Sequence, residues 1–183
     1  MQVYLVRHTA VEVPLGFCYG RTDVALRSGF LFDFQQIKNK IPFTQQTAVF
    51  SSPSGRCREL AAFMSSEYTL DERLLEMDFG DWEGKNWNVV DAEEWFNDYV
   101  NVAPPNGESM LDLYDRVEDF IAFLRKSRYE SVVVVTHAGV LRCVLAVILG
   151  IPLTQVFKVK LNFGQIIKLT ISENMDFDEL VLE

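Results

Sequence analysis

The chain contains only two histidines, and each directly follows a run of apolar residues. His8 comes after the letters LVR, and His137 comes after VVT. A single histidine is more often a satisfied core residue than a catalyst, but two at equivalent strand ends indicate a shared site. We therefore expect both side chains to reach the same edge of one sheet.

The neighbours of these histidines favour an anion over a metal ion. Two histidines can bind a metal, but no Asp or Glu lies at close ligand spacing from either one. Arg7 adjoins His8, and a cation beside a ligand opposes metal binding. A guanidinium stays charged and binds phosphate oxygens through paired hydrogen bonds. The pattern predicts a site for a phosphate group and no metal.

The hydrophobic pattern predicts the elements that must position this site. Strands are expected at residues 2–6, 47–50 and 132–135, the last a β-branched run typical of a strand covered on both faces. Helices are expected at about residues 28–39, 54–66, 109–126 and 138–149. Ser54 is a candidate N-cap of the second helix, and Gly150 with Pro152 ends the last one.

The remaining segments complete an α/β fold. Residues 69–75 are expected to be extended, residues 156–159 and 165–171 to form a closing antiparallel pair, and residues 172–183 to be an acidic, partly frayed tail. Strands that alternate with helices indicate a three-layer α/β/α sandwich with a central, mostly parallel sheet. We expect one domain over residues 1–183, with ligands bound at the carboxyl ends of the strands.

Composition argues against several classes of protein. With 183 residues, 49% of them hydrophobic, the chain can bury a core without disulfides or metals. The net charge of -9 argues against nucleic acid as a partner, since nucleic-acid binding needs a broad basic face. The longest apolar region, residues 132–153, is interrupted by His137, Arg142 and two glycines, which argues against a membrane span.

The N-terminus and the cysteines indicate the cytoplasm. The chain starts directly with a strand-like segment and carries no basic stretch, apolar run and cleavage site of an export signal. Its three cysteines, Cys18, Cys57 and Cys143, lack metal-ligand spacing and are expected to be reduced thiols. None is followed by an arginine six positions later, which argues against the Cys-x5-Arg loop of cysteine phosphatases.

Four motifs, in order along most of the chain, resemble the histidine phosphatase superfamily, which includes the cofactor-dependent phosphoglycerate mutases. They are residues 7–9 (RHT), 52–56 (SPSGR), 75–84 (LEMDFGDWEG) and 136–140 (THAGV). Thr9 stands where the commonest form of the first motif has glycine. The resemblance implies a phosphoglycerate mutase-like fold and phosphoryl transfer through a phosphohistidine, without metal or cofactor.

A closer resemblance is to the alpha-ribazole phosphatases of cobalamin assembly. Residues 18–26 (CYGRTDVAL) are similar to their Cys-Tyr-Gly-x-x-Asp-Val-x-Leu signature, and residues 76–84 and 106–109 also fit. This resemblance implies hydrolysis of alpha-ribazole 5'-phosphate, a small phosphorylated metabolite. A broad phosphatase of sugar phosphates or nucleotides stays open. A mutase is less well supported because the chain is short, and the intact motifs argue against a non-catalytic phosphate-binding module.

The superfamily resemblance also implies the roles of the site residues. His8 would be the nucleophile, kept unprotonated at neutral pH by neighbouring cations. Arg7, Arg56 and His137 would hold the phosphoryl oxygens and offset charge in the transition state. The backbone at Ala138 would add a helix N-terminus to the same phosphate pocket.

Two carboxylates compete for the role of proton donor. The family match assigns Glu76, and Glu83 is the local rival in the same acidic segment. Arg21 is a candidate for contact with phosphate or with the rest of the substrate, although an exposed surface arginine is nearly as good an interpretation. Glu83 is a second candidate for substrate contact. Arg142 either supports the site or pairs with an acid elsewhere, and we leave it outside the catalytic set.

The loops carry two further hypotheses. Ser109 fits a family loop motif together with Glu108, and it is equally well predicted as the N-cap of the long helix, with Asp112 at the capping-box position. Four aromatic residues could line a pocket for a flat base, although such clusters are more often core: Trp82, Trp87, Trp95 and Phe96.

Overall fold

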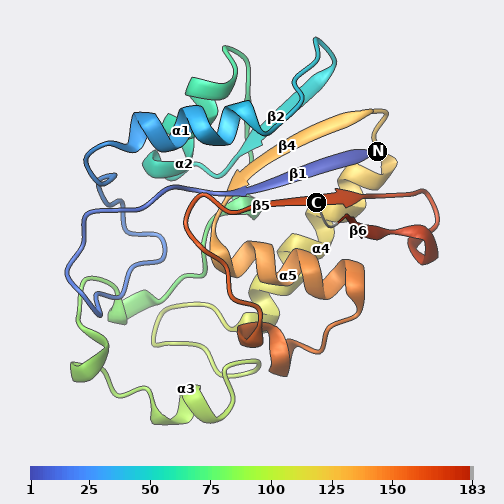
Figure 1. The fold of residues 1–183 in the computed structure, drawn as a ribbon. Coiled ribbons are helices and arrows are strands. Elements are labelled where there is room, and N and C mark those ends of the chain that lie inside the picture. Colours follow the sequence, from blue (N-terminus) through green and yellow to red (C-terminus); the bar gives the residue numbers. More distant parts are fainter. Residues whose placement is uncertain (182–183) are drawn as a thin grey trace.

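A computed structural model describes residues 1–181, in which six strands form one sheet in the order β3-β2-β4-β1-β5-β6 (Figure 1). The first four strands along the chain run parallel, while β5 pairs antiparallel with both β1 and β6. The strands are β1 (Gln2–Arg7), β2 (Thr47–Ser51), β3 (Thr69–Leu70), β4 (Ser131–Thr136), β5 (Ile166–Thr170) and β6 (Glu179–Val181).

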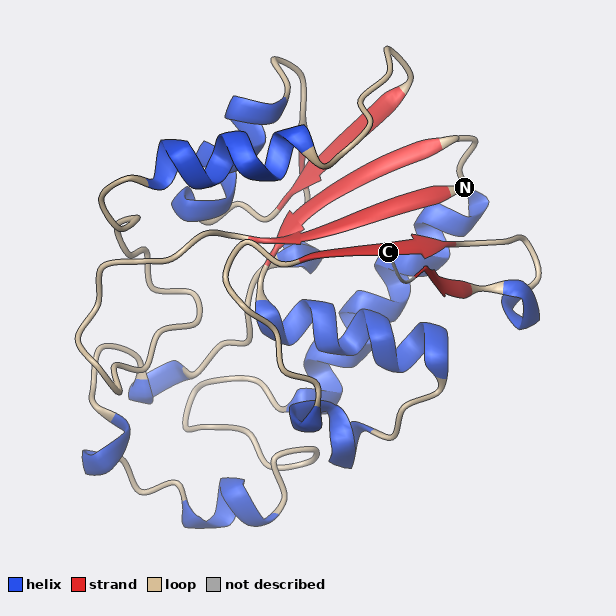
Figure 2. Cartoon of the chain, viewed as in Figure 1, coloured by secondary structure: helices blue, strands red, loops and turns tan. Residues whose placement is uncertain are grey.

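Helices cover both faces of this sheet (Figure 2). Helices α1 (Phe30–Asn39) and α2 (Gly55–Met64) lie on one face, and α4 (Met110–Lys126) and α5 (Ala138–Leu149) lie on the other. The expected three-layer α/β/α sandwich with a mostly parallel sheet is therefore confirmed. The shorter helices are α3 (Glu93–Asn97) and five 3-10 turns: η1 (Glu72–Leu74), η2 (Gly80–Trp82), η3 (Trp87–Val89), η4 (Leu153–Lys158) and η5 (Met175–Phe177).

The central strands read as continuous apolar runs because both of their faces are buried. In β4, Val132 and Val134 pack toward α4 and α5, whereas Val133 and Val135 pack toward α1 and α2. The alternation of side chains along a strand thus divides one valine run between two cores. The apolar region 132–153 becomes β4 and α5, and no helix within residues 1–181 has the length and apolar character needed to span a membrane.

The expected strand at residues 156–159 is wrong. This segment belongs to the 3-10 turn η4, which starts after Pro152, a residue whose fixed φ suits the start of a helical turn. Val156 is buried against the α5 side of the core, but its neighbours Phe157 and Lys158 are exposed, so the alternating burial of a strand is missing. The antiparallel partners of β5 are β1 and β6 instead.

Other boundaries also differ from expectation. The acidic tail contributes β6, which is anchored where Arg125 on α4 donates to the Asp178 carboxylate, while residues 182–183 lie outside the described residues. The extended segment 69–75 is a two-residue strand followed by η1. Ser54 does precede α2, but its side chain makes no capping hydrogen bond.

Candidate active site

The two histidines meet at the carboxyl edge of the sheet. β1 and β4 pair in parallel with Arg7 opposite Thr136, so His8 and His137 each lie one residue beyond their strand. The His8 amide donates to the Thr136 carbonyl at 3.0 Å, and the two ring centroids are 5.2 Å apart, edge to face. The expectation that both histidines reach one edge is confirmed, and both are buried.

His8 has one ring nitrogen available as a nucleophile. Its Nδ1 lies 2.8 Å from the Thr9 carbonyl, and because a carbonyl can only accept, the ring proton must be on Nδ1. Nε2 therefore keeps its lone pair. Burial, followed by the positive charge of Arg56 and then of Arg7, lowers the pKa of His8 to about 3, so the ring is neutral at pH 7. Thr9 has no positive φ, which explains why a residue with a side chain fits at this position.

His137 has the opposite tautomer. A guanidinium can only donate, so the 3.2 Å contact between Arg56 Nη2 and His137 Nδ1 makes Nδ1 an acceptor and leaves the proton on Nε2. That proton points to Ser52 Oγ at 2.8 Å, and the Ser52 hydroxyl proton goes on to Ser54 Oγ. Burial and the nearby positive charges hold the pKa of His137 well below its usual range. Both N–H and lone pair of His137 are thus used within the protein.

Arg7 and Arg56 bring two cations to the site, Arg56 buried and Arg7 half-buried. Arg56 donates to the carbonyls of Gly20 at 2.6 Å and Thr22 at 3.0 Å, and Arg7 donates to the Leu161 carbonyl at 2.7 Å. Within residues 1–181 neither forms an ion pair with a carboxylate, and the Nε atom of each is buried without a hydrogen-bond partner. Cations without a carboxylate partner and with unused donors favour a bound anion.

The Glu76 carboxylate lies at the N-terminus of α5. It accepts from the Gly139 amide, at 3.1 Å to Oε1 and 3.2 Å to Oε2, and from the Met77 amide at 3.0 Å. A Cβ atom at Gly139 would lie 2.2 Å from Oε1, so only glycine allows this approach. The Gly139 amide, which follows Ala138 in the first turn of α5, therefore donates to Glu76. Ala138 is the first residue of α5 and does not line the cavity described next, as far as residues 1–181 show.

One cavity of about 200 Å³ brings four of the predicted catalytic residues together. His8, both arginines and Glu76 line the same space, and the rest of the wall is aromatic. His137 contacts Arg56 and lies outside this lining. The lining residues are Arg7, His8, Phe17, Tyr19, Arg56, Glu76, Phe79 and Trp87. A wider groove, of about 750 Å³, runs along β5 and contains no histidine or carboxylate among its lining residues within the described chain.

Glu83 holds a loop and does not face the cavity. It accepts from the amides of Arg21 at 2.8 Å, Thr22 at 2.5 Å and Phe79 at 3.2 Å, and from the Thr22 hydroxyl. Burial raises the pKa of Glu83, but these hydrogen bonds outweigh it and leave the pKa below its ordinary value. The Glu83 carboxylate is thus ionised and hydrogen-bonded to the loop that contains Arg21 and Thr22. Of the two candidate acids, only Glu76 lines the cavity together with His8.

Two further arginines lie outside the cavity lining. Arg21 pairs with Asp78 and Glu108, each at 3.3 Å, and its side chain is 39% exposed. Arg142 donates to the Val159 carbonyl at 3.3 Å and lies over the Phe157 ring. The structure does not bring Arg21 to the cavity, and it gives Arg142 protein partners instead.

The aromatic prediction holds for one residue. Trp87 lines the cavity, whereas Trp82 and Trp95 are buried core residues and Phe96 is 63% exposed. The pattern missed Phe17, which reaches the cavity through a long-range bridge to Asn86. Phe79 and Tyr19, also missed, lie within the quoted motifs, which could have pointed to them.

Ser52 is a further site residue that sequence reasoning missed. It is the first residue of the SPSGR motif and accepts the hydrogen bond from His137, and its place directly after β2 was the available signal. The N-cap interpretation of Ser109 is confirmed, because its side chain and that of Asp112 form a reciprocal capping box.

Known proteins resemble this chain in sequence and in fold. The sequence profile of the histidine phosphatase superfamily (branch 1) matches residues 3–177. A Hydrogenobacter thermophilus protein provisionally named phosphoserine phosphatase 2 is 30% identical over 177 residues, covering 88% of this chain and 85% of the relative. The adenosylcobalamin/alpha-ribazole phosphatase of Escherichia coli is 28% identical over 176 residues, covering 90% and 87%. The crystal structure of the alpha-ribazole phosphatase from Shigella flexneri superposes with a TM-score of 0.86 at 26% identity, covering 100% and 95%.

Proposed function

Because this chain belongs to the histidine phosphatase superfamily (branch 1), whose named relatives include phosphatases, we propose that it hydrolyses a small phosphomonoester through a phosphohistidine on His8. The observation that carries the proposal is the shared cavity. It combines a neutral imidazole with a free Nε2, two guanidinium cations and one carboxyl group.

In the first step, His8 Nε2 donates its lone pair to phosphorus, and the bond between phosphorus and the leaving oxygen breaks. Arg7 and Arg56 offset the negative charge on the phosphoryl oxygens, which suits their unused donors. Glu76 donates a proton to the leaving oxygen. Because the Gly139 amide has one hydrogen, one carboxyl oxygen stays available for this transfer.

In the second step, water attacks the phosphohistidine. Glu76, now ionised, accepts a proton from that water, and the bond between phosphorus and His8 Nε2 breaks. Inorganic phosphate leaves, and His8 returns to its neutral form with the proton still on Nδ1. The Thr9 carbonyl supports this cycle, since it stabilises the positive charge that the ring carries while phosphorylated.

The rest of the cavity wall supports a substrate with an aromatic group. Apart from the four phosphate-handling residues, every lining residue is aromatic: Phe17, Tyr19, Phe79 and Trp87. Such a wall suits a flat base, whereas the ammonium and carboxylate of phosphoserine would find no further charged partner there within residues 1–181. We therefore propose alpha-ribazole 5'-phosphate as the substrate, in line with the name of the Escherichia coli relative.

The test is metal-free phosphate release from alpha-ribazole 5'-phosphate, phosphoserine, sugar phosphates and nucleotides. Stacking of a base on aromatic side chains contributes about 1–3 kcal/mol, so we expect a preference of about 10–100-fold in kcat/KM over phosphoserine. His8→Ala should abolish turnover and the acid-labile, alkali-stable phosphorylation of the chain. Comparable rates across the panel would refute alpha-ribazole 5'-phosphate as the specific substrate and indicate a broad phosphatase. Activity in His8→Ala would overturn the phosphohistidine mechanism.

A further inference from the structure

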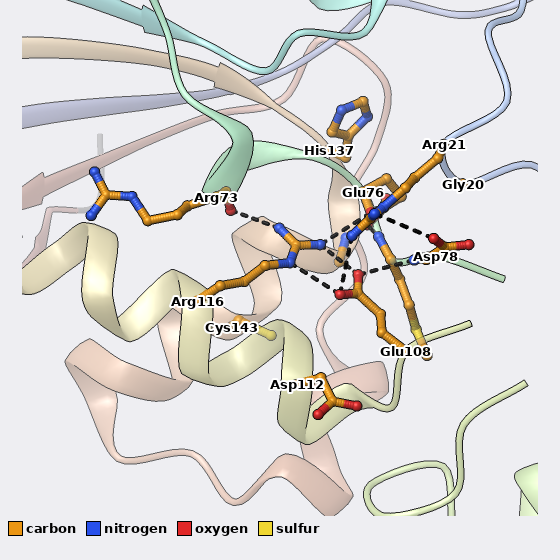
Figure 3. A network of polar contacts seen from close by, with 12 residues as sticks. Gly20, Arg21, Arg73, Glu76, Asp78, Glu108, Asp112, Arg116, His137 and Cys143 are labelled. Carbon is orange, nitrogen blue, oxygen red and sulfur yellow. Dashed lines mark hydrogen bonds and ion pairs between the residues drawn. The ribbon is translucent and has the colours of Figure 1, made fainter. Parts of the chain in front are cut away.

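Side-chain contacts help to hold the Glu76 segment in position. Residues 75–79 form no helix or strand between η1 and η2, and the Asp78 carbonyl accepts a backbone hydrogen bond from the Glu108 amide at 3.0 Å. Arg116, on α4, donates from Nη1 to the Arg73 carbonyl at 2.7 Å and from Nη2 to the Glu76 carbonyl at 3.1 Å (Figure 3). One guanidinium thus holds both the start of this irregular segment and the backbone of the proposed acid.

Glu108 fixes the orientation of that guanidinium. Its Oε1 accepts from Arg116 Nη2 at 2.6 Å, and its Oε2 accepts from Arg116 Nε at 3.2 Å. Glu108 Oε1 also accepts from the Asp78 amide at 3.0 Å, and its Oε2 contacts Arg21. The ion pair therefore binds the backbone on both sides of the Glu76 side chain, and it is largely buried, with 17% and 13% of the two side chains exposed.

Helix α4 positions both members of the pair. Glu108 immediately precedes Ser109, whose capping box with Asp112 defines the start of α4, and Arg116 lies about two turns into the helix. The paired hydrogen bonds of a carboxylate and a guanidinium have a defined plane, which a lysine cannot reproduce. Helix α4 thus supplies a regular frame that positions the irregular backbone of residues 75–79.

We propose that the Glu108–Arg116 ion pair is a positioning pair that aims the Glu76 carboxyl at the leaving-group oxygen. This inference rests on the proposed role of Glu76 as the acid. Neither member lines the cavity, so the pair acts through Glu76 and not by touching substrate. A misplacement of about 1 Å in a reacting group can reduce a rate by about 10²-fold, so the pair should affect proton donation most.

The experiment separates proton donation from phosphate handling by the choice of leaving group. p-Nitrophenyl phosphate releases an anion that needs no proton, whereas an alkyl phosphate such as glycerol 3-phosphate releases an alkoxide that does. The ratio kcat/KM covers only the steps up to departure of the leaving group, so it leaves out the attack of water, in which Glu76 acts for either ester. Glu76→Gln provides the reference, with kcat/KM reduced much more for the alkyl ester. For Arg116→Lys and Glu108→Gln we expect kcat/KM to fall by about 10–100-fold for the alkyl ester and by less than about 3-fold for the aryl ester.

The chain offers a matched control in a second ion pair on the same helix. Arg125 donates to both oxygens of Asp178, at 3.0 Å and 2.6 Å, with 14% and 1% of the two side chains exposed. This pair anchors β6 and lies far from the cavity lining. Arg125→Lys should therefore lower thermal stability as Arg116→Lys does while leaving the ratio of alkyl to aryl rates unchanged.

The outcomes distinguish the inference from the proposed function. If Glu76→Gln shows the selective loss while Arg116→Lys and Glu108→Gln do not, the positioning role is refuted and the acid remains. If Glu76→Gln shows no selective loss, the proposed acid fails and the inference fails with it. Glu108→Gln keeps the size and one oxygen of the side chain, so it reports on the pair even if Arg116→Lys does not fold. An equal loss for both esters in both variants would also count against positioning.

Discussion

Replacing Ser52 by alanine removes the oxygen that accepts the Nε2 proton of His137 at 2.8 Å. Neither tautomer of the His137 ring then has a good set of hydrogen-bond partners. With the proton on Nε2, the nearest remaining acceptor is the Cys57 sulfur at 3.5 Å, which is weak. With the proton on Nδ1, the ring N–H faces the Arg56 Nη2 group at 3.2 Å, so two donors oppose each other.

The expected magnitude follows from these contacts. A buried donor left without a partner costs about 1–3 kcal/mol, and the sulfur recovers part of that, so the free energy of unfolding should fall by about 2 kcal/mol. If the tautomer changes, Arg56 loses its contact with His137 and shifts in the cavity. A loss of about 1.4–2.7 kcal/mol of transition-state stabilisation would lower kcat/KM by about 10–100-fold.

The assay combines phosphate release, urea unfolding and the ¹⁵N chemical shifts of the two His137 ring nitrogens. Ser51→Ala is the matched control, because Ser51 is equally buried but donates only to the Ser52 carbonyl, at 2.9 Å. It should leave the His137 shifts and kcat/KM close to those of the wild type. Equal effects of both substitutions on activity, or unchanged His137 shifts and activity in Ser52→Ala, would refute the proposed coupling between Ser52, His137 and Arg56.

Three further predictions concern the cavity and its histidines. Gly139→Ala places a Cβ 2.2 Å from Glu76 Oε1 and should lower kcat for alkyl esters by about 10²-fold in a chain that still unfolds cooperatively; a wild-type rate would contradict the close approach. Trp87→Ala should raise KM for alpha-ribazole 5'-phosphate by about 10-fold with little change for phosphoserine, and equal changes would argue against stacking. His8 and His137 are neutral when folded but protonate near pH 6.5 when unfolded, so stability falls as the pH drops below about 6.5, by about 1.4 kcal/mol per histidine at pH 5.5. We expect urea unfolding at pH 7.5 and 5.5 to show, for His8→Gln, about half of the loss of stability that the wild type shows. A loss equal to that of the wild type would count against a buried neutral His8.

Much of the fold could be predicted from patterns of neighbouring residues in the sequence. An apolar run buried on both faces marks a central strand, and its last residue marks the edge where ligands bind, which is how His8 and His137 could be assigned to one site. The capping box of Ser109 and Asp112 is likewise local, because the side chains and backbone amides of both residues lie within one turn. Such features depend on neighbours in the chain, so one sequence suffices to predict them.

The errors arose where long-range packing decided the outcome. Residues 156–159 have a strand-like composition, but they form most of the 3-10 turn after Pro152 and its C-cap. Val156 is buried in the core and Val159 packs against it only in part. The C-terminal strand β6 depends on Asp178 meeting Arg125, which is 53 positions away in sequence. No local pattern records that contact.

The same distinction applies to the site. Glu76 and Glu83 lie in one acidic segment and have similar surroundings in sequence, and only the tertiary structure directs Glu76 to the start of α5 and Glu83 to the amides of residues 21–22. The sequence by itself determined the reactive groups and the sheet edge that carries them, because strand ends and residue types are local properties. The tertiary structure alone decided which carboxyl, which aromatic wall and which ion pair surround them, because those contacts join segments that meet only when the chain folds.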